Sequence, residues 1–326
     1  MECLGRNNTH TIFIIMPDDS NNFECPYILA YPHDYKENNP IILESNNQEN
    51  GMKLVSSALS GTLERMFPIL VHSQNTNPIL VPLLPSFNNG VPYFQQLSVE
   101  CFDASKTGKF HRIDQQVVSM IEDAKKIIKG LSGKKVPDKI ILNGYSSSGV
   151  FAQRFALLHP ELVSAACIGG AIGTMPLPLE QHQGKEIAYP LGIADYEKLT
   201  GKPFNIEAYK KIKFTYYVTE GENEVLSDSR TKEDGSKAPM CDMTYMARST
   251  PSEVGKTVRN LFGIDSFERI TSQLVIADSL GVQTNYIEPI KGVSHHTIGN
   301  AASEIIAQVI TNANSEAKET SKKIGW

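Results

Sequence analysis

The sequence lacks the features that mark membrane proteins and nucleic-acid-binding proteins. No apolar run approaches the roughly 18 residues that a membrane-spanning helix needs. The 31 lysines and arginines are outnumbered by 36 aspartates and glutamates, which gives a formal net charge of -5. A chain without an excess of basic residues has no electrostatic footprint for a phosphate backbone. We therefore expect no membrane span and no nucleic acid as a partner.

Cysteines and cofactor motifs are scarce as well. Five cysteines occur, at positions 3, 25, 101, 167 and 241, and none forms a Cys-x-x-Cys pair. An odd number leaves at least one thiol unpaired, which favours a reducing compartment. Neither a His-Glu-x-x-His motif nor a Gly-x-Gly-x-x-Gly fingerprint occurs in a supporting context, so we expect no metal and no organic cofactor. The N-terminus lacks a signal-peptide pattern, which predicts a cytoplasmic protein as the sequence stands, or a secreted one if a signal peptide has been removed.

What is present is an ordinary globular composition arranged in alternating strands and helices. Hydrophobic residues make up 40% and charged residues 21%, a balance that allows a large buried core. Short apolar runs bounded by turn residues predict strands at 11–16, 27–31, 41–44, 79–83, 139–143, 165–168, 214–218 and 286–290. Apolar residues at helical spacing predict helices at 113–131, 147–159, 266–280 and 298–311. The alternation predicts one α/β domain over residues 1–326, with a mainly parallel sheet and helices on both faces.

Three segments break this alternation. Residues 173–211 and 226–254 are rich in prolines and turn residues, and we interpret both as insertions that form a cap over the site. Segment 312–326 is polar, and we expect it to be a frayed terminus. Four aromatic residues of the first insertion are candidates for lining an acyl or aryl pocket, with core packing of the cap as the alternative: Tyr189, Tyr196, Phe204 and Tyr209.

The most informative motif is Asn-Gly-Tyr-Ser-Ser-Ser-Gly at residues 143–149, which lies between a predicted strand and a predicted helix. A serine on a tight strand-to-helix turn has a strained backbone, needs small neighbours and points its hydroxyl away from the sheet. Gly144 and Ser148 are such neighbours. The motif therefore predicts Ser146 as a nucleophile, and the alternative is that these serines only cap the helix.

A serine nucleophile needs a base, and the base needs an orienting carboxylate. With the chain order serine, acid, histidine, the base is expected in the loop before the last helix. We predict His295 there, with His296 as the rival. The acid is expected after the strand at 214–218, where the turn Thr-Glu-Gly-Glu-Asn-Glu follows. We predict Glu224 as this acid, with Asp228 as the runner-up.

Two backbone donors are expected to stabilise an oxyanion beside the nucleophile. Ser147 begins the predicted helix, where N–H groups and a partial positive charge point toward the nucleophile. The second donor is expected in the loop after the strand at 41–44, where small polar residues allow the backbone to turn inward. Within that loop we choose Asn46.

With these residues placed, the chain resembles the α/β-hydrolase superfamily, and within it the esterases related to polyhydroxybutyrate depolymerases and feruloyl esterases. The resemblance spans most of the chain and lies in GYSSSGVFAQRFALLHPELV at 144–163, TEGENE at 219–224 and GVSHHT at 292–297. It implies an α/β-hydrolase fold with a cap insertion and a Ser146, Glu224, His295 triad. Two positions depart from the family pattern, with Glu224 where aspartate is commoner and Ser148 where glycine is commoner.

The sequence thus predicts a serine hydrolase that cleaves carboxylic esters through an acyl-enzyme on Ser146. The substrate would be a small-molecule or polymeric ester, and the sequence does not indicate the acyl group, the alcohol or the oligomeric state. Two alternatives stay open: an amidase or peptidase that uses the same residues, and a non-catalytic binding protein of the same fold. A base nitrogen within about 3.2 Å of the Ser146 hydroxyl would favour catalysis over the binding protein.

Overall fold

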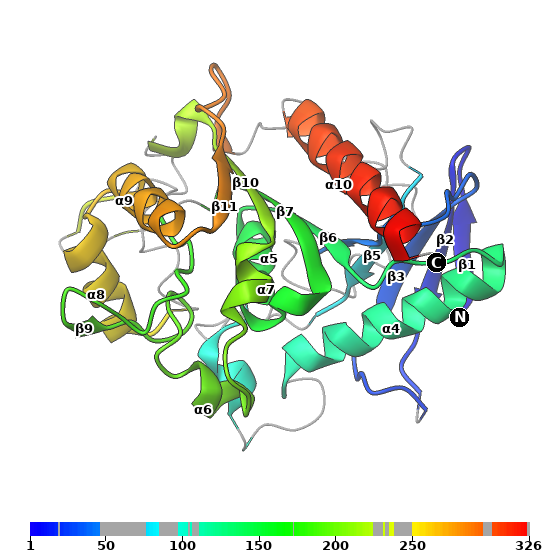
Figure 1. Cartoon of the computed structure of the whole chain (residues 1–326), viewed down its shortest axis with the longest axis horizontal. Coiled ribbons are helices and arrows are strands. Elements are labelled where there is room, and N and C mark those ends of the chain that lie inside the picture. Colours follow the sequence, from blue (N-terminus) through cyan, green and yellow to red (C-terminus); the bar gives the residue numbers. More distant parts are fainter. Residues whose placement is uncertain are drawn as a thin grey trace.

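One sheet runs through the molecule. The computed structural model describes residues 1–18, 20–45, 76–84, 97–103, 105, 111–171, 173–223, 231, 235–237, 250–295 and 302–324. In this part of the chain nine strands form the sheet, in the order β1-β2-β3-β5-β4-β6-β7-β10-β11, and Figure 1 shows β1 and β11 at opposite edges. The strands are β1 (Glu2–Arg6), β2 (His10–Ile15), β3 (Tyr27–Pro32), β4 (Ile42–Glu44), β5 (Ile79–Pro82), β6 (Ile140–Tyr145), β7 (Val163–Gly169), β10 (Lys213–Tyr217) and β11 (Gln283–Tyr286).

The sheet is mixed but mainly parallel. The pairings from β1 through β2 and β3 to β5 are antiparallel. Every later pairing, from β5 through β4, β6, β7 and β10 to β11, is parallel. Parallel strands need crossover connections that run over the faces of the sheet, and these connections are mostly helices. The predicted fold class, α/β with a mainly parallel sheet, is confirmed.

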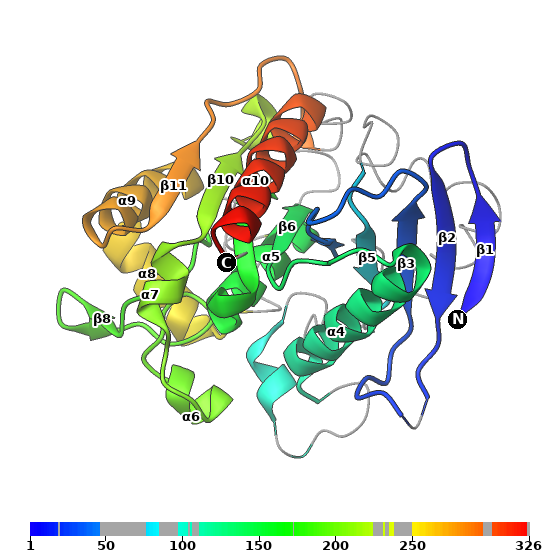
Figure 2. The same ribbon diagram turned by 45° about the vertical axis from the view of Figure 1, so that its right-hand side comes forward.

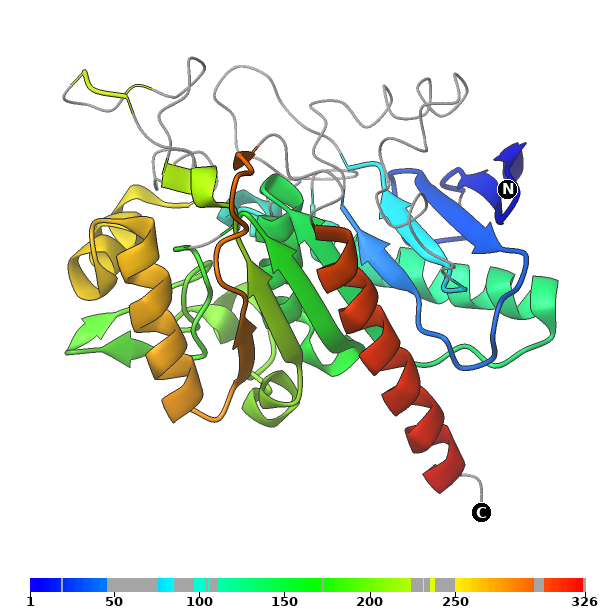
Figure 3. The ribbon, with the colours of Figure 1, turned by 90° about the horizontal axis from the view of Figure 1, so that it is seen from above.

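Helices cover both faces of this sheet. On β6, Ile140 and Leu142 belong to the hydrophobic cluster that contains the buried residues of α4 (Ile113–Ser132) and α5 (Ser147–Leu158). The intervening Ile141 belongs to the cluster with α10 (Ser303–Ile324). Figure 2 shows α4 beside β3, and Figure 3 shows α10 alongside β7. Because β6 is buried on both faces, it appears in the sequence as a continuous apolar run.

The helix boundaries follow local signals in the sequence. Helix α4 ends at Gly133, which adopts a left-handed conformation at φ 68° and donates its N–H to the carbonyl of Lys129. Helix α9 (Ser266–Ser279) begins at a capping box, in which Asp265 and Glu268 satisfy each other's backbone N–H groups. In the described ranges, no helix is both long and apolar enough to span a membrane.

One predicted strand is misplaced at the edge of the sheet, and two elements of the fold were not predicted. Strand β11 lies at Gln283–Tyr286 rather than 286–290, because the polar residues before Tyr286 pair with β10 at the rim of the sheet. The prediction followed the apolar residues beyond it. Strand β1 and helix α8 (Ser252–Phe262) were not predicted. Helix α8 begins within the second predicted insertion, most of which lies outside the described residues.

Residues 312–324 of the polar segment are not a frayed end, because α10 continues through them to Ile324. Val309, Ile310 and Ala313 pack into the cluster on this face of the sheet. Asn314 exchanges amide hydrogen bonds of 2.8 and 2.9 Å with Asn77, next to β5. These tertiary contacts hold a stretch whose composition alone suggested fraying.

The insertion at 173–211 packs along α5 toward its C-terminal end, where Tyr196 donates its hydroxyl to the carbonyl of Leu158. It contains a hairpin of β8 (Gln181–His182) and β9 (Lys185–Glu186) and two short helices, α6 (Tyr196–Thr200) and α7 (Ile206–Lys210). Its aromatic residues belong to or pack against the main core, with Tyr196 and Tyr209 each touching the ring of Phe204. The pocket interpretation of these aromatics is wrong, and the core-packing alternative is confirmed.

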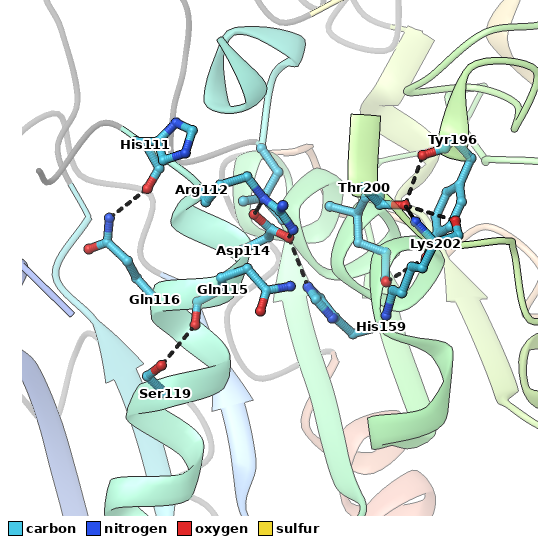
Figure 4. Close-up of polar contacts among 12 residues, drawn as sticks. His111, Arg112, Asp114, Gln115, Gln116, Ser119, His159, Tyr196, Thr200 and Lys202 are labelled. Atoms are coloured by element: carbon cyan, nitrogen blue, oxygen red, sulfur yellow. Dashed lines mark hydrogen bonds and ion pairs between the residues drawn. The ribbon is translucent and has the colours of Figure 1, made fainter. Parts of the chain in front are cut away.

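A buried ionic cluster ties α4 to the end of α5, as Figure 4 shows. Arg112 donates to both carboxylate oxygens of Asp114, at 2.9 and 2.8 Å. His159, just past α5, lies 3.1 Å from Asp114 through Nε2. Burial alone would raise the pKa of Asp114, but hydrogen bonds from Arg112 and His159 hold it well below its usual range. The cluster fixes the two helices on one face of the sheet.

Candidate active site

Ser146 occupies a strained turn between β6 and α5. Its backbone lies at φ 59° and ψ -119°, a conformation that residues other than glycine seldom adopt. The turn is held by the Ser146 N–H, which donates to the carbonyl of Gly169 on β7, and by the Ser146 carbonyl, which accepts from Val150. The strand and the helix on either side thus fix the position of the Ser146 side chain, which remains partly exposed.

The turn tolerates almost no side-chain volume. A Cβ atom on Gly144 would lie 2.3 Å from the Ser148 carbonyl oxygen, and one on Gly149 would lie 2.8 Å from the Gly169 carbonyl oxygen. Ser148, where the family pattern has glycine, folds its hydroxyl back onto Tyr145. It accepts from the Tyr145 N–H at 2.8 Å and donates to the Tyr145 carbonyl at 2.9 Å. The serine at position 148, in place of glycine, therefore stabilises the turn through these two hydrogen bonds.

A chain of hydrogen bonds leads from Ser146 into the protein. The Ser146 Oγ lies 2.9 Å from Nε2 of His295, and Nδ1 of His295 lies 2.7 Å from Oε2 of Glu222. Glu222 is 0% exposed and His295 is 5% exposed. A neutral imidazole that donates Nδ1–H to the carboxylate presents Nε2 as the acceptor for the serine proton. The arrangement can activate the hydroxyl and stabilise an imidazolium.

The carboxylate that contacts Nδ1 of His295 is that of Glu222, whereas the sequence analysis predicts Glu224, which lies outside the described residues. Glu220–Asn223 form a 3-10 turn, in which residues three apart share a side. Thr219 accordingly donates its hydroxyl to Glu222, at 3.3 Å. Glu220 points elsewhere and accepts from the N–H of Gly292 at 3.1 Å. Thr-x-x-Glu, a spacing typical of capped turns, was the signal that would have singled out Glu222.

Four predicted site residues fall outside the described residues, and their predicted roles stay predictions. These are Glu224, Asp228, His296 and Asn46. Ser147 is described and is the first residue of α5, so its N–H lies where the helix dipole favours a negative charge. Among the residues that the structure describes, no group of three or more His, Cys, Asp or Glu side chains is placed to hold a metal ion.

The imidazole of His295 is closely enclosed by backbone and ring atoms. Gly170, at φ 57° just after β7, approaches it so closely that an added Cβ would lie 2.9 Å from Cε1 of His295 and 2.8 Å from Cζ of Tyr145. The rings of Tyr145 and His295 have centroids 4.9 Å apart. Only glycine fits at position 170 without displacing the imidazole of His295.

A second histidine and carboxylate pair, His159 with Asp114, has similar chemistry but a different position. His159 follows the last residue of α5, at the end of the helix opposite to Ser146. It is 2% exposed and its ring packs against Phe155 at a centroid distance of 4.9 Å. This pair is therefore part of the buried ionic cluster, and the histidine that faces Ser146 is His295.

Glu44 is a buried carboxyl on β4, the strand next to β6. It ends β4, is paired in register with Asn143 of β6, and accepts from the Asn143 side-chain amide at 2.7 Å. Burial raises the pKa of Glu44 to about 7, and the hydrogen bond from Asn143 partly opposes this. Within the described part of the chain, the Asn143 amide oxygen is buried and has no hydrogen-bond partner. Glu44 is thus protonated in the folded state at pH values where an unfolded glutamate is ionised.

We expect Glu44→Gln to stabilise the protein at alkaline pH. Because the folded state keeps the proton between pH 4.5 and about 7 while the unfolded chain loses it, wild-type stability falls as pH rises through this window. Glutamine stays neutral and can donate to the Asn143 amide oxygen. Its advantage over wild type should grow by on the order of 2 kcal/mol between pH 5 and pH 8. Urea unfolding at both values tests this, and an equal difference at the two pH values would contradict it.

Comparisons with known proteins identify the fold. No protein-family model matches the sequence, and no curated protein sequence matches it. The structure is similar to poly(aspartic acid) hydrolase-1 from Sphingomonas sp. KT-1, with a TM-score of 0.53, 15% sequence identity, and 91% of this chain and 97% of that chain covered. A poly(3-hydroxybutyrate) depolymerase from Bordetella parapertussis gives a TM-score of 0.51 and 14% identity, with 91% and 87% covered. The chain has the α/β-hydrolase fold, as the sequence resemblance implied.

Proposed function

We propose that the protein is a serine hydrolase that cleaves carboxylic esters. The observation that carries the proposal is the 2.9 Å contact between the Ser146 hydroxyl and Nε2 of His295, backed by Glu222 at 2.7 Å. This contact lies within the 3.2 Å that a general base needs, and a binding protein of the same fold would not require it. The strained backbone of Ser146 supports the same conclusion, because such strain is typical of a nucleophile on a strand-to-helix turn.

In the proposed reaction, Ser146 Oγ attacks the ester carbonyl while His295 Nε2 takes the hydroxyl proton. The N–H of Ser147, at the N-terminus of α5, donates to the oxyanion that forms. His295 then passes its proton to the alcohol, which leaves, while the acyl group stays on Ser146 Oγ as an acyl-enzyme. Water, deprotonated by His295, attacks the acyl-enzyme; His295 returns this proton to Ser146 Oγ as the bond to the acyl group breaks and the carboxylic acid is released. Glu222 holds the imidazole in one tautomer and stabilises the imidazolium throughout.

The second oxyanion donor is proposed in the segment after β4, as the sequence suggests. Glu44 and Ser45 are the last described residues before this segment, and Glu44 sits beside Asn143, three residues before Ser146. The end of β4 therefore lies near the turn that contains Ser146. Asn46 remains our choice for the donor.

Paired substrates test the proposal and separate esters from amides. We expect p-nitrophenyl acetate and butyrate to be hydrolysed with an initial burst of p-nitrophenol that matches the enzyme concentration, because an acyl-enzyme accumulates. The p-nitroanilides of the same acyl groups should react far more slowly. Faster turnover of the anilides would favour an amidase or peptidase, and no turnover of any of these substrates by folded protein would count against a hydrolase.

A further inference from the structure

Tyr145 is the last residue of β6 and immediately precedes Ser146. Its half-buried side chain extends to the two residues that support the nucleophile, although these come from distant parts of the sequence. The hydroxyl lies 3.2 Å from Oε1 of Glu222, 3.0 Å from the carbonyl oxygen of His295 and 3.4 Å from Nδ1 of His295. One phenol thus contacts both the acid and the base.

The contacts of Glu222 divide between its two oxygens. Oε2 accepts from Nδ1 of His295, while Oε1 faces the hydroxyls of Tyr145 and Thr219. A carboxylate fixed at both oxygens keeps its plane and its distance to the imidazole, which a buried carboxylate bonded through one oxygen would not. The Tyr145 hydroxyl has one proton, so it donates either to Glu222 or to the His295 carbonyl, and each choice restrains one side of the pair.

The Tyr145 ring is held in place independently of its hydroxyl. It stacks on Tyr217 with ring centroids 6.0 Å apart and lies 4.9 Å from the imidazole of His295. Gly170 packs against it so closely that a Cβ there would meet the ring at 2.8 Å. Removing only the hydroxyl should therefore leave the ring where it is and isolate the effect of the hydrogen bonds.

The protonation state of Tyr145 suits a donor. Burial and the negative charge of Glu222 raise the pKa of the Tyr145 phenol well above its usual range, so the phenol remains protonated. The titratable groups around it in the described part of the chain are Glu222 on the acid turn, His295 on the base loop and Tyr217 on β10.

We propose that Tyr145 is a positioning residue, whose hydroxyl keeps the side chains of Glu222 and His295 in the correct position relative to Ser146. The proposal deepens the proposed function and rests on it. Tyr145 would act through the other residues, since its hydroxyl is bonded to the acid and the base rather than aimed at Ser146. Its place in β6 means that any shift of the nucleophile turn also moves the hydroxyl that restrains its partners.

Tyr145→Phe is the test, with Tyr216→Phe as the matched control. Tyr216 is buried on β10, and among the described residues its hydroxyl has no hydrogen-bond partner. We expect Tyr145→Phe to lower kcat for ester hydrolysis by roughly 10- to 100-fold with little change in KM, the size of a lost hydrogen bond to a charged group. Tyr216→Phe should stay within about twofold of wild type, since no bond is lost.

The pH profile separates positioning from simple packing. Loss of the phenol hydroxyl removes its contacts with Glu222 and His295, which a change in packing alone would leave as they are. The dependence of kcat/KM on pH should therefore change in Tyr145→Phe and remain in place in Tyr216→Phe. Wild-type rates and an unshifted profile in Tyr145→Phe, with an active parent enzyme, would overturn the proposal.

A spectroscopic readout keeps this proposal distinct from the proposed function. The Nδ1–H proton of His295, bonded to Glu222, should give a downfield proton NMR resonance that moves or broadens in Tyr145→Phe and not in Tyr216→Phe. A moved resonance in a protein without hydrolase activity would support positioning while the proposed function fails. A resonance that is unchanged in Tyr145→Phe would overturn positioning, whatever the activity.

Discussion

Ser146→Ala should lower kcat for ester hydrolysis by about 10^6-fold, because without the hydroxyl no acyl-enzyme can form. The residual rate should show no burst and should not depend on the protonation of His295. The fold should survive the change, since the backbone strain at φ 59° is the same for alanine and the side chain is small and partly exposed. Ester hydrolysis under single-turnover conditions measures the effect.

A serine that takes no part in the site provides the control for this change. Ser119 is partly exposed on α4 and, within the described part of the chain, donates to the carbonyl of Gln115. Ser119→Ala should hydrolyse esters at the wild-type rate and unfold at nearly the same temperature. Ester hydrolysis by Ser146→Ala within tenfold of wild type would place the nucleophile elsewhere.

Glu222→Gln should lower kcat by about 10^4-fold with little change in KM. Glutamine has nearly the same shape, but it carries no charge and can present its amide to Nδ1, which favours the imidazole tautomer with the proton on Nε2. That tautomer cannot accept the Ser146 proton. Glu222 is fully buried and bonded to His295 at 2.7 Å, so the substitution acts directly on the group that contacts Nδ1.

The two other glutamates of the sequence Thr-Glu-Gly-Glu-Asn-Glu are the controls. Glu220→Gln and Glu224→Gln should both stay within a few-fold of wild type, because the acid on His295 is already Glu222 and Glu220 bonds the backbone of Gly292. A large loss in Glu224→Gln together with an active Glu222→Gln would restore the assignment made from the sequence. Circular dichroism and thermal unfolding of the three variants exclude a shared folding defect.

The proposed nucleophile and base could be picked out of the sequence because their positions follow from neighbouring residues and from chain order. Ser146 lies between an apolar strand and a helix, and the residues on either side of it predict both elements. His295 follows from chain order, since it lies in the loop before the last helix. Both are found where the sequence placed them, and the structure brings them within 2.9 Å of each other.

Which glutamate contacts His295 could not be predicted from the amino-acid composition of this segment. The answer depends on the backbone conformation of Glu220–Asn223. In an extended segment, the side chains of Glu222 and Glu224 would point to the same side. The 3-10 conformation of Glu220–Asn223 instead places the Glu222 side chain beside Thr219 and His295. The role of Tyr145 was equally hidden, because its partners lie 77 and 150 positions away along the chain. Such contacts follow from the sheet order, which no short motif encodes.

The errors in the fold have a similar origin. Tertiary contacts stabilise the polar half of α10 and the polar strand β11. The spacing of apolar residues along the sequence does not predict such contacts. The insertion at 173–211 could be recognised by its composition, yet its aromatics serve the core rather than a pocket. The local composition showed where the alternation of strands and helices is interrupted. The structural role of the insertion at 173–211 depends on its packing against the core.

Labelling with a fluorophosphonate probe tests most directly whether Ser146 is an activated nucleophile. Intact-mass measurement followed by peptide mapping gives the number and the position of the adducts. We predict one adduct per chain, on Ser146, formed quickly in the wild type and lost in His295→Ala, because the base is needed for the attack. An unlabelled, folded wild-type protein, or an adduct on another residue, would contradict the account.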